Sequence, residues 1–136
     1  MKQIKESLEV VGLPKPKGVW SAAIVSQPCR QVFIAGMLAK DENGNLVGVG
    51  DISAQTEQVI HNLRLAVEAD GGTLQDIVRV DVYIRDMGHF EQIHAVRRKY
   101  FKEAPPVSTM VEVSRMTDER ALIEMNAIAV LPERAA

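Results

Sequence analysis

The segment from Pro105 to Leu131 places the tightest constraint on the fold, because it contains two strand patterns separated by a polar turn. Residues from Val107 to Val113 alternate in the way that is typical of a strand with two distinct faces. The run from Ala121 to Val130 is mostly apolar, yet Glu124 and Asn126 lie two positions apart and therefore share one face. A carboxylate in an apolar strand is costly to bury without a partner. We therefore expect the chemistry of this protein to involve Glu124.

The composition is typical of a single soluble domain of 136 residues, with 46% hydrophobic residues and a formal charge of -2. This charge gives no basic surface for nucleic acid and no attraction to anionic membranes. Glu6 and Glu9 interrupt the N-terminal residues, so we expect no signal peptide. One cysteine, Cys29, cannot form an intramolecular disulfide, which favours a reducing compartment. We predict a cytoplasmic protein that binds neither nucleic acid nor membrane.

Periodicity predicts the order β-β-α-β-α-β-β, with helices on one face of a mixed sheet, an α+β fold. We expect no regular structure in residues 1–17, because prolines end that segment. The predicted strands and helices cover residues 18–26, 31–36, 51–70, 77–85, 88–101, 107–113 and 121–130. We expect the second strand to pair with the first. Asp51 or Ser53 can cap the first helix, and Gly71 can end it.

The strand predicted at 77–85 has one polar face, which includes Tyr83. A polar face on a central strand must meet water or a partner subunit. The second helix contains the basic run Arg97–Lys99, which we interpret as a solvated helix face rather than a nucleic-acid site.

Several short motifs, in this order and spacing, resemble one known family over nearly the whole chain. They are Phe33–Gly36, Asp76–Val78, Val82–Asp86 with Phe90, Pro106, Val111–Val113 and Ile123–Val130. The chain resembles the RidA family of reactive enamine/imine intermediate deaminases, also called the endoribonuclease L-PSP family. The resemblance implies a chorismate-mutase-like fold, a homotrimer, and small-molecule clefts between neighbouring subunits.

The resemblance also implies roles for individual residues. Glu124 stands where the family has the glutamate that positions or activates the attacking water. Ser108 stands where deaminating members have an arginine that binds the substrate carboxylate. Without that guanidinium, a carboxylate substrate loses a charged hydrogen-bond partner. We therefore expect activity on standard 2-imino acids to be weak or absent, with the chain in a branch that lacks this arginine.

The remaining cleft positions follow from the same resemblance or from the residue types. Gly36 is retained, and Ala35 precedes it where many members have serine. Trp20 stands at a tyrosine position and His94 at an asparagine position, while Met110 stands at a small or thiol position. We expect the cleft to be lined by Ser108, Trp20, Ala35, Gly36, His94, Met110 and Tyr83. For Trp20, Met110 and Tyr83, packing at a subunit interface is the alternative to ligand contact. For His94, the alternative is a histidine on the surface of the helix.

Four arginines are candidates to replace the missing anchor from a neighbouring subunit, although no spacing favours any of them: Arg79, Arg85, Arg97 and Arg115. His89 and His94 are five positions apart, which is not the spacing of metal ligands on one helix face. The sequence contains neither a phosphate-binding loop nor a dinucleotide fingerprint. We expect no metal and no cofactor.

Two functions remain open from the sequence. The first is hydrolysis of an enamine or imine C–N bond, with Glu124 positioning water. The second is non-catalytic metabolite binding or regulation, in which Glu124 is only an interface residue. RNA cleavage, which one family name suggests, is disfavoured by the acidic chain.

Overall fold

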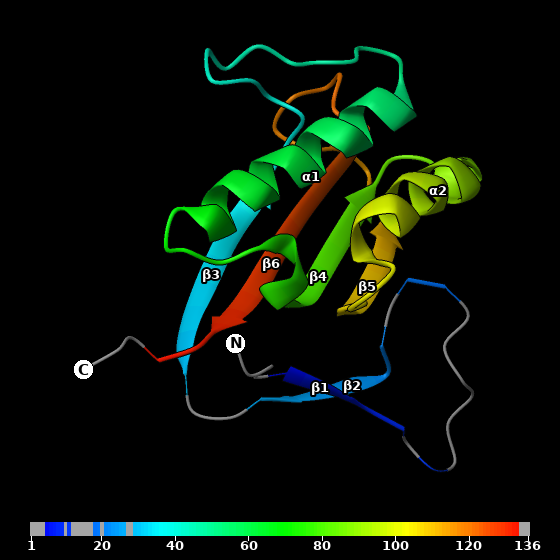
Figure 1. The fold of residues 1–136 in the computed structure, drawn as a ribbon. Helices are drawn as coiled ribbons and strands as arrows, with labels where there is room; N and C mark the ends of the chain where they lie inside the picture. Colours follow the sequence, from blue (N-terminus) through cyan, green and yellow to red (C-terminus); the bar gives the residue numbers. More distant parts are fainter. Residues whose placement is uncertain (1–4, 10, 12–17, 20, 27–28, 134–136) are drawn as a thin grey trace.

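Two strands with alternating residues form the middle of the sheet in the computed structural model, which describes residues 5–9, 11, 18–19, 21–26 and 29–133 (Figure 1). These strands are β4 (Ile77–Ile84) and β6 (Ile123–Leu131), and they pair antiparallel. On the outer sides, β3 (Arg30–Met37) pairs antiparallel with β6, and β5 (Val107–Glu112) runs parallel to β4. The order β3-β6-β4-β5 makes a mixed sheet, in which β4 separates β5 from β6.

Both helices, α1 (Ile52–Glu68) and α2 (Phe90–Phe101), lie across the same face of this sheet (Figure 1). Asp51 caps α1 by accepting a hydrogen bond from the backbone N–H of Ala54 at 3.0 Å. Short 3-10 helices, η1 (Leu74–Asp76) and η2 (Met87–His89), precede β4 and α2. The predicted α+β fold, with helices on one face of a mixed sheet, is confirmed.

The hydrophobic core fills the space between this sheet face and the helices. Alternate residues of the two central strands point into it, as the period of two requires. The strands contribute Val80, Val82, Ile84, Ile123, Met125, Ala127 and Ala129, and the helices contribute Val59, Ile60, Leu63, Val67, Ile93, Val96 and Phe101. This aliphatic core determines which strand residues face away from the helices.

No described helix covers the opposite face of the sheet, which we call the open face (Figure 1). This face carries polar side chains of β4 and β6. Asn126 donates a hydrogen bond from Nδ2 to Oδ2 of Asp81 at 3.1 Å, and Arg79 pairs with the same aspartate at 3.2 Å. Phe33 of β3 is 71% exposed beside these groups, opposite Ile128 of β6. The open face thus combines satisfied polar groups with an exposed aromatic ring.

The N-terminal part of the chain differs from the prediction. Lys5–Leu8 forms a strand, β1, which pairs with β2 (Ala23–Ser26) in a separate two-stranded sheet, so residues before 18 do not all lack regular structure. The expected pairing of the first two predicted strands is also wrong, because β3 pairs with β6 instead.

Long-range hydrogen bonds explain why the hairpin of β1 and β2 lies where β4 and β5 begin (Figure 1). Lys5 donates from Nζ to the carbonyl oxygens of Ile77 and Ala104 at 2.6 and 3.2 Å. Burial lowers the pKa of Lys5 to about 8, and nearby Asp76 partly opposes this change. Such contacts between residues far apart in the chain cannot be read from local periodicity.

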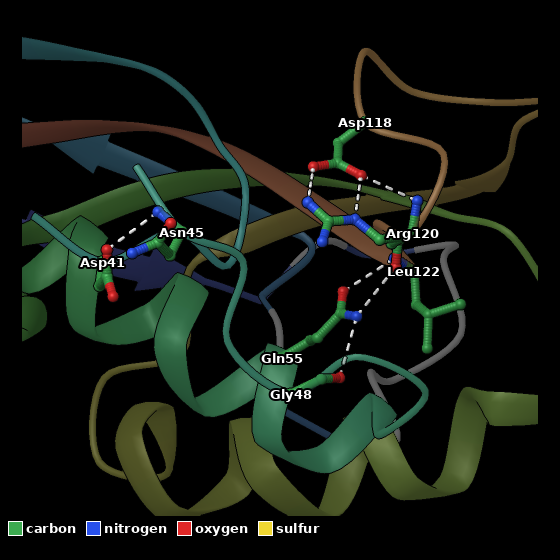
Figure 2. Close-up of polar contacts among 7 residues, drawn as sticks. All are labelled: Asp41, Asn45, Gly48, Gln55, Asp118, Arg120 and Leu122. Atoms are coloured by element: carbon green, nitrogen blue, oxygen red, sulfur yellow. Dashed lines mark hydrogen bonds and ion pairs between the residues drawn. The ribbon is translucent and has the colours of Figure 1, made fainter. Parts of the chain in front are cut away.

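Gln55 of α1 joins two loops at one end of the sheet, as Figure 2 shows. Its side-chain amide donates to the carbonyl oxygens of Gly48 and Arg120 at 3.1 and 3.0 Å, and its Oε1 accepts from the N–H of Leu122 at 2.8 Å. The side chain is fully buried. One residue therefore satisfies three backbone groups and fixes the approach to β6.

Among the described helices, none is both long and apolar enough to cross a membrane.

We expect Gln55→Leu to lower the free energy of unfolding by about 2–3 kcal/mol, because three backbone groups lose their partner while the side-chain volume is kept. Chemical denaturation measures this change. Gln92→Leu, at an exposed position of α2, is the matched control, with an expected change within about 0.5 kcal/mol. Equal effects of the two substitutions would contradict the role given to Gln55.

Candidate functional site

The strand register places the predicted site residues on opposite faces of the sheet. Residues paired across neighbouring strands share a face, and neighbours along one strand do not. Ser108 and Met110 of β5 pair with Val80 and Val82, which face the helices. The next residue, Tyr83, pairs with Glu124 and points to the open face. Within one chain, Glu124 and Ser108 therefore cannot contact the same ligand.

Glu124 lies on the wall of an open cavity of about 580 Å³, together with residues of the loop before β6: Arg115, Met116, Thr117 and Glu119. Its side chain is half-buried and makes no hydrogen bond or ion pair with any residue that the structure describes. Gly36 of β3 lies directly against it, since a Cβ at this position would be 2.5 Å from Oε1 of Glu124. Glycine at position 36 therefore leaves room for the carboxylate.

The loop beside Glu124 is held by an ion pair between Asp118 and Arg120 (Figure 2). The side chain of Arg120 donates to both carboxylate oxygens at 3.1 and 2.9 Å, and its backbone N–H donates at 2.9 Å. These side-chain and then backbone hydrogen bonds lower the pKa of Asp118 to about 2. Together with Gln55, this contact orders the loop that forms one wall of the cavity.

A second cavity, of about 160 Å³, lies between α2 and β5. We call it the α2 cavity, and it is lined by Phe90, His94, Arg97, Ser108 and Met110. It brings together three of the predicted cleft residues, Ser108, His94 and Met110. It is about the size of a small organic molecule and lies on the helix side of the sheet.

Arg97, one of the four candidate arginines, also lines the α2 cavity. Its Nη2 donates to Oγ of Ser108 at 2.9 Å, and its Nε is buried without a hydrogen-bond partner among the described residues. The whole residue is only 3% exposed, and burial lowers its pKa to about 10, so it remains charged at neutral pH. The prediction that the run Arg97–Lys99 is a solvated face is therefore wrong for Arg97, whereas Arg98 and Lys99 are exposed.

His94 is buried in the same cavity, so the alternative of a surface histidine is wrong. Its ring stacks on Phe90 with a centroid distance of 5.4 Å. Gly18 lies against the other side, where a Cβ would be 2.4 Å from Cε1 of His94, and its φ of 135° also favours glycine. Burial lowers the pKa of His94 most, followed by the charges of Arg98 and Arg97, while Glu91 opposes them.

The other predicted residues divide as follows. Ala35 is exposed on β3 beside Gly36, and Tyr83 is half-buried on the open face. Trp20 lies outside the described residues. Of the other candidate arginines, Arg79 pairs with Asp81 and Arg115 lines the Glu124 cavity. Among the described residues, no group of three His, Cys, Asp or Glu side chains is arranged to hold a metal ion.

A larger groove of about 980 Å³ runs between β3 and α1, and it includes Gly36 and Met37. Two polar side chains on its helix side, Gln58 and Asn62, already have partners. Asn62 donates to the carbonyl oxygens of Leu38 and Lys40 at 3.0 and 2.9 Å, and Gln58 donates to Asn62 at 3.0 Å. These bonds attach the loop after β3 to α1, which is a structural role.

Comparison with known proteins identifies the family of the chain. The family profile described as Endoribonuclease L-PSP matches residues 12–131. The chain belongs to the endoribonuclease L-PSP family.

Individual relatives of this L-PSP family chain cover nearly its full length. A RutC family protein of Pyrococcus horikoshii is 39% identical over 126 residues, which is 93% of this chain and 98% of the relative. The 3-aminoacrylate deaminase RutC of Acinetobacter baylyi is 31% identical over 92% of this chain and 97% of its own. The crystal structure of a Rid family protein of unknown function from Yersinia pestis matches with a TM-score of 0.88 at 28% identity, covering 95% of this chain and all of that one.

The lowered pKa of His94 predicts a pH dependence of stability. As pH falls below about 6.5, the unfolded chain takes up a proton before the folded protein does, so unfolding becomes easier. We expect wild type to lose stability relative to His94→Gln between pH 7 and pH 5, as measured by urea denaturation. His61→Gln, at an exposed position of α1, controls for the loss of one histidine. A constant difference between wild type and His94→Gln across this range would contradict the prediction.

Proposed function

We propose that this protein binds a small metabolite in clefts between its subunits and hydrolyses an enamine or imine C–N bond there, with Glu124 positioning the water. We also assign it to a branch of the family that lacks the strand arginine, because Ser108 stands at that position. One relative is named a 3-aminoacrylate deaminase, and this relative and a RutC family protein are similar to almost the whole of this chain.

The observation that carries the proposal is the environment of Glu124. The carboxylate has no described partner, faces a cavity of about 580 Å³ and lies over a glycine that leaves it space. A carboxylate with a structural role at this position would be expected to accept hydrogen bonds from its surroundings. An unpaired, half-buried carboxylate is instead suited to accept a proton from water.

The chemistry requires one group that moves a proton twice. Glu124 takes a proton from water as the water oxygen adds to the imine carbon, and it returns this proton to the nitrogen, which gives a carbinolamine. Glu124 then moves a proton from the carbinolamine hydroxyl to its nitrogen as the C–N bond breaks, which releases ammonia and leaves a carbonyl compound. Enamines enter the same route after protonation at carbon gives the imine.

The sheet geometry supports a cleft between two copies of the chain. Glu124 faces the open side and Ser108 faces the helix side, so a ligand that touches both must receive them from different subunits. The open face also carries Phe33, an exposed aromatic ring of the kind found at subunit contacts. A homotrimer, as the family resemblance implies, would cover this face and bring Glu124 of one subunit close to Ser108 of the next.

We expect the purified protein to release ammonia from 2-iminobutanoate, generated in situ, only weakly but still faster than the spontaneous rate, because Ser108 stands where deaminating members have the arginine. Glu124→Gln should lower kcat by about 10²–10⁴, because the amide keeps the shape but cannot accept the proton. Ammonia release in a coupled assay measures both rates.

Glu119→Gln is the matched control, since Glu119 lines the same cavity and is exposed. It should keep the wild-type rate. Wild-type activity in Glu124→Gln, or equal losses in the two variants, would contradict the role of Glu124. No acceleration by wild type, with ligand binding retained, would favour the non-catalytic metabolite-binding alternative.

The proposed assembly predicts a solution mass of three chains of 15.0 kDa each. Phe33→Asp should dissociate this assembly, because it introduces a charge on the face that the assembly would cover. Light scattering after size-exclusion chromatography measures the mass. Leu65→Asp, at a position 53% exposed on α1, should remain trimeric. A monomeric wild type would contradict the shared cleft.

A further inference from the structure

Arg97 is a buried cation to which the described structure gives no counter-charge. No described carboxylate pairs with it, and burial lowers its pKa. Removing a guanidinium from water is expensive unless hydrogen bonds and an opposite charge compensate for the loss. Among the described residues, one neutral hydroxyl, that of Ser108, accepts a hydrogen bond from it. A group with these properties is prepared to receive an anion.

The surroundings of Arg97 define the size and kind of anion. The α2 cavity beside it is about 160 Å³, with the rings of Phe90 and His94 and the side chain of Met110 on its other walls. These walls favour a short organic ligand rather than a bare ion. Nε and Nη2 lie on the same edge of the guanidinium, which is the edge that binds a carboxylate through two parallel hydrogen bonds. Ser108 keeps its own O–H free to donate.

We propose that Arg97 of α2, supported by Ser108, is the anion anchor of the cleft and binds the carboxylate of a small organic acid in the α2 cavity. The guanidinium that the sequence lacks on β5 is supplied from the facing helix of the same chain. This inference rests on the proposed function for the identity of the cleft, but it requires no catalysis.

A second observation separates this role from a structural one. A structural arginine would be expected to have its donors satisfied by the protein, whereas Nε of Arg97 is buried with no described partner. Replacing such a cation by a neutral side chain should leave stability unchanged or raise it, while the affinity for an anion falls. A structural role predicts the reverse: lower stability with no change in affinity.

The test is a titration with sodium pyruvate, a small carboxylate that the protein cannot hydrolyse. Isothermal titration calorimetry at low salt measures the binding. We expect saturable binding by wild type and at least tenfold weaker binding by Arg97→Gln. Arg97→Lys should bind with intermediate affinity, because it keeps the charge but loses the planar fork. Methyl pyruvate, which has no charge, should not compete.

Arg98→Gln is the matched control, because it removes the same formal charge from an exposed neighbour on the same helix. It should keep wild-type affinity, and thermal unfolding of all variants shows whether each is folded. If pyruvate does not bind to wild type, or binds equally to Arg97→Gln and Arg98→Gln, the inference is overturned. If Arg97→Gln loses thermal stability but keeps its affinity, Arg97 is structural and the inference is also overturned.

The same titration distinguishes this inference from the proposed hydrolysis. Glu124→Gln should lose ammonia release but still bind pyruvate, because Arg97 rather than Glu124 is the proposed partner of the carboxylate. If wild type binds pyruvate but releases no ammonia from 2-iminobutanoate, the proposed hydrolysis is rejected and the anchor is retained. Hydrolysis of 2-iminobutanoate that is unchanged in Arg97→Gln would retain hydrolysis and reject the anchor.

Discussion

The antiparallel pairing of β4 with β6 is the constraint on which the rest of the structure depends. Its register directs Val82 and Met125 into the core, and it directs Tyr83 and Glu124 to the open face. A shift by one residue would bury the carboxylate of Glu124 under the helices and expose the apolar residues. The hydrophobic core therefore determines where the polar groups can be, and with them both halves of the candidate site.

The fold also explains how an arginine on α2 can take the place of an arginine on β5 in the proposed anion anchor. Ser108 of β5 and Arg97 of α2 face each other, and their side chains are in contact at 2.9 Å. A long side chain on the helix reaches the position that a long side chain on the strand would otherwise occupy. Ser108 must then be small, because two guanidinium groups in one small cavity would repel each other. Ser108 therefore makes room for Arg97 and accepts its hydrogen bond, and is more than the loss of an arginine from β5.

Local signals allowed much of the fold to be predicted. Asp51 caps α1 as predicted, because a cap depends on a few neighbouring residues, and Thr73 with Asp76 forms a similar local capping box at η1. The alternation in β4 predicted its polar face, since the period of two is a property of the strand itself. The two-stranded sheet of β1 and β2 could not be predicted, because the hydrogen bonds of Lys5 reach residues 72 and 99 positions away.

The site was only partly predictable, for a similar reason. Glu124 stood out as a carboxylate in an apolar strand, which is a local anomaly. Arg97 did not, because a run of three basic residues resembles an exposed surface of a helix. Its spacing from His94 carried the available signal, since positions three apart on a helix share a face. Only the packing of α2 on the sheet shows that this face is turned toward Ser108.

The two halves of the site have opposite requirements, and the sheet keeps them apart. In the proposed roles, Arg97 needs a dry, enclosed cavity so that its charge binds an anion strongly, whereas Glu124 needs access to water in order to move a proton. Within a single chain, the sheet separates these environments completely. A cleft between subunits can bring the enclosed cation of one chain close to the wetted carboxylate of the next without burying either beside its own core. Division of the site between two faces is therefore a physical reason for assembly, beyond the area that assembly would cover.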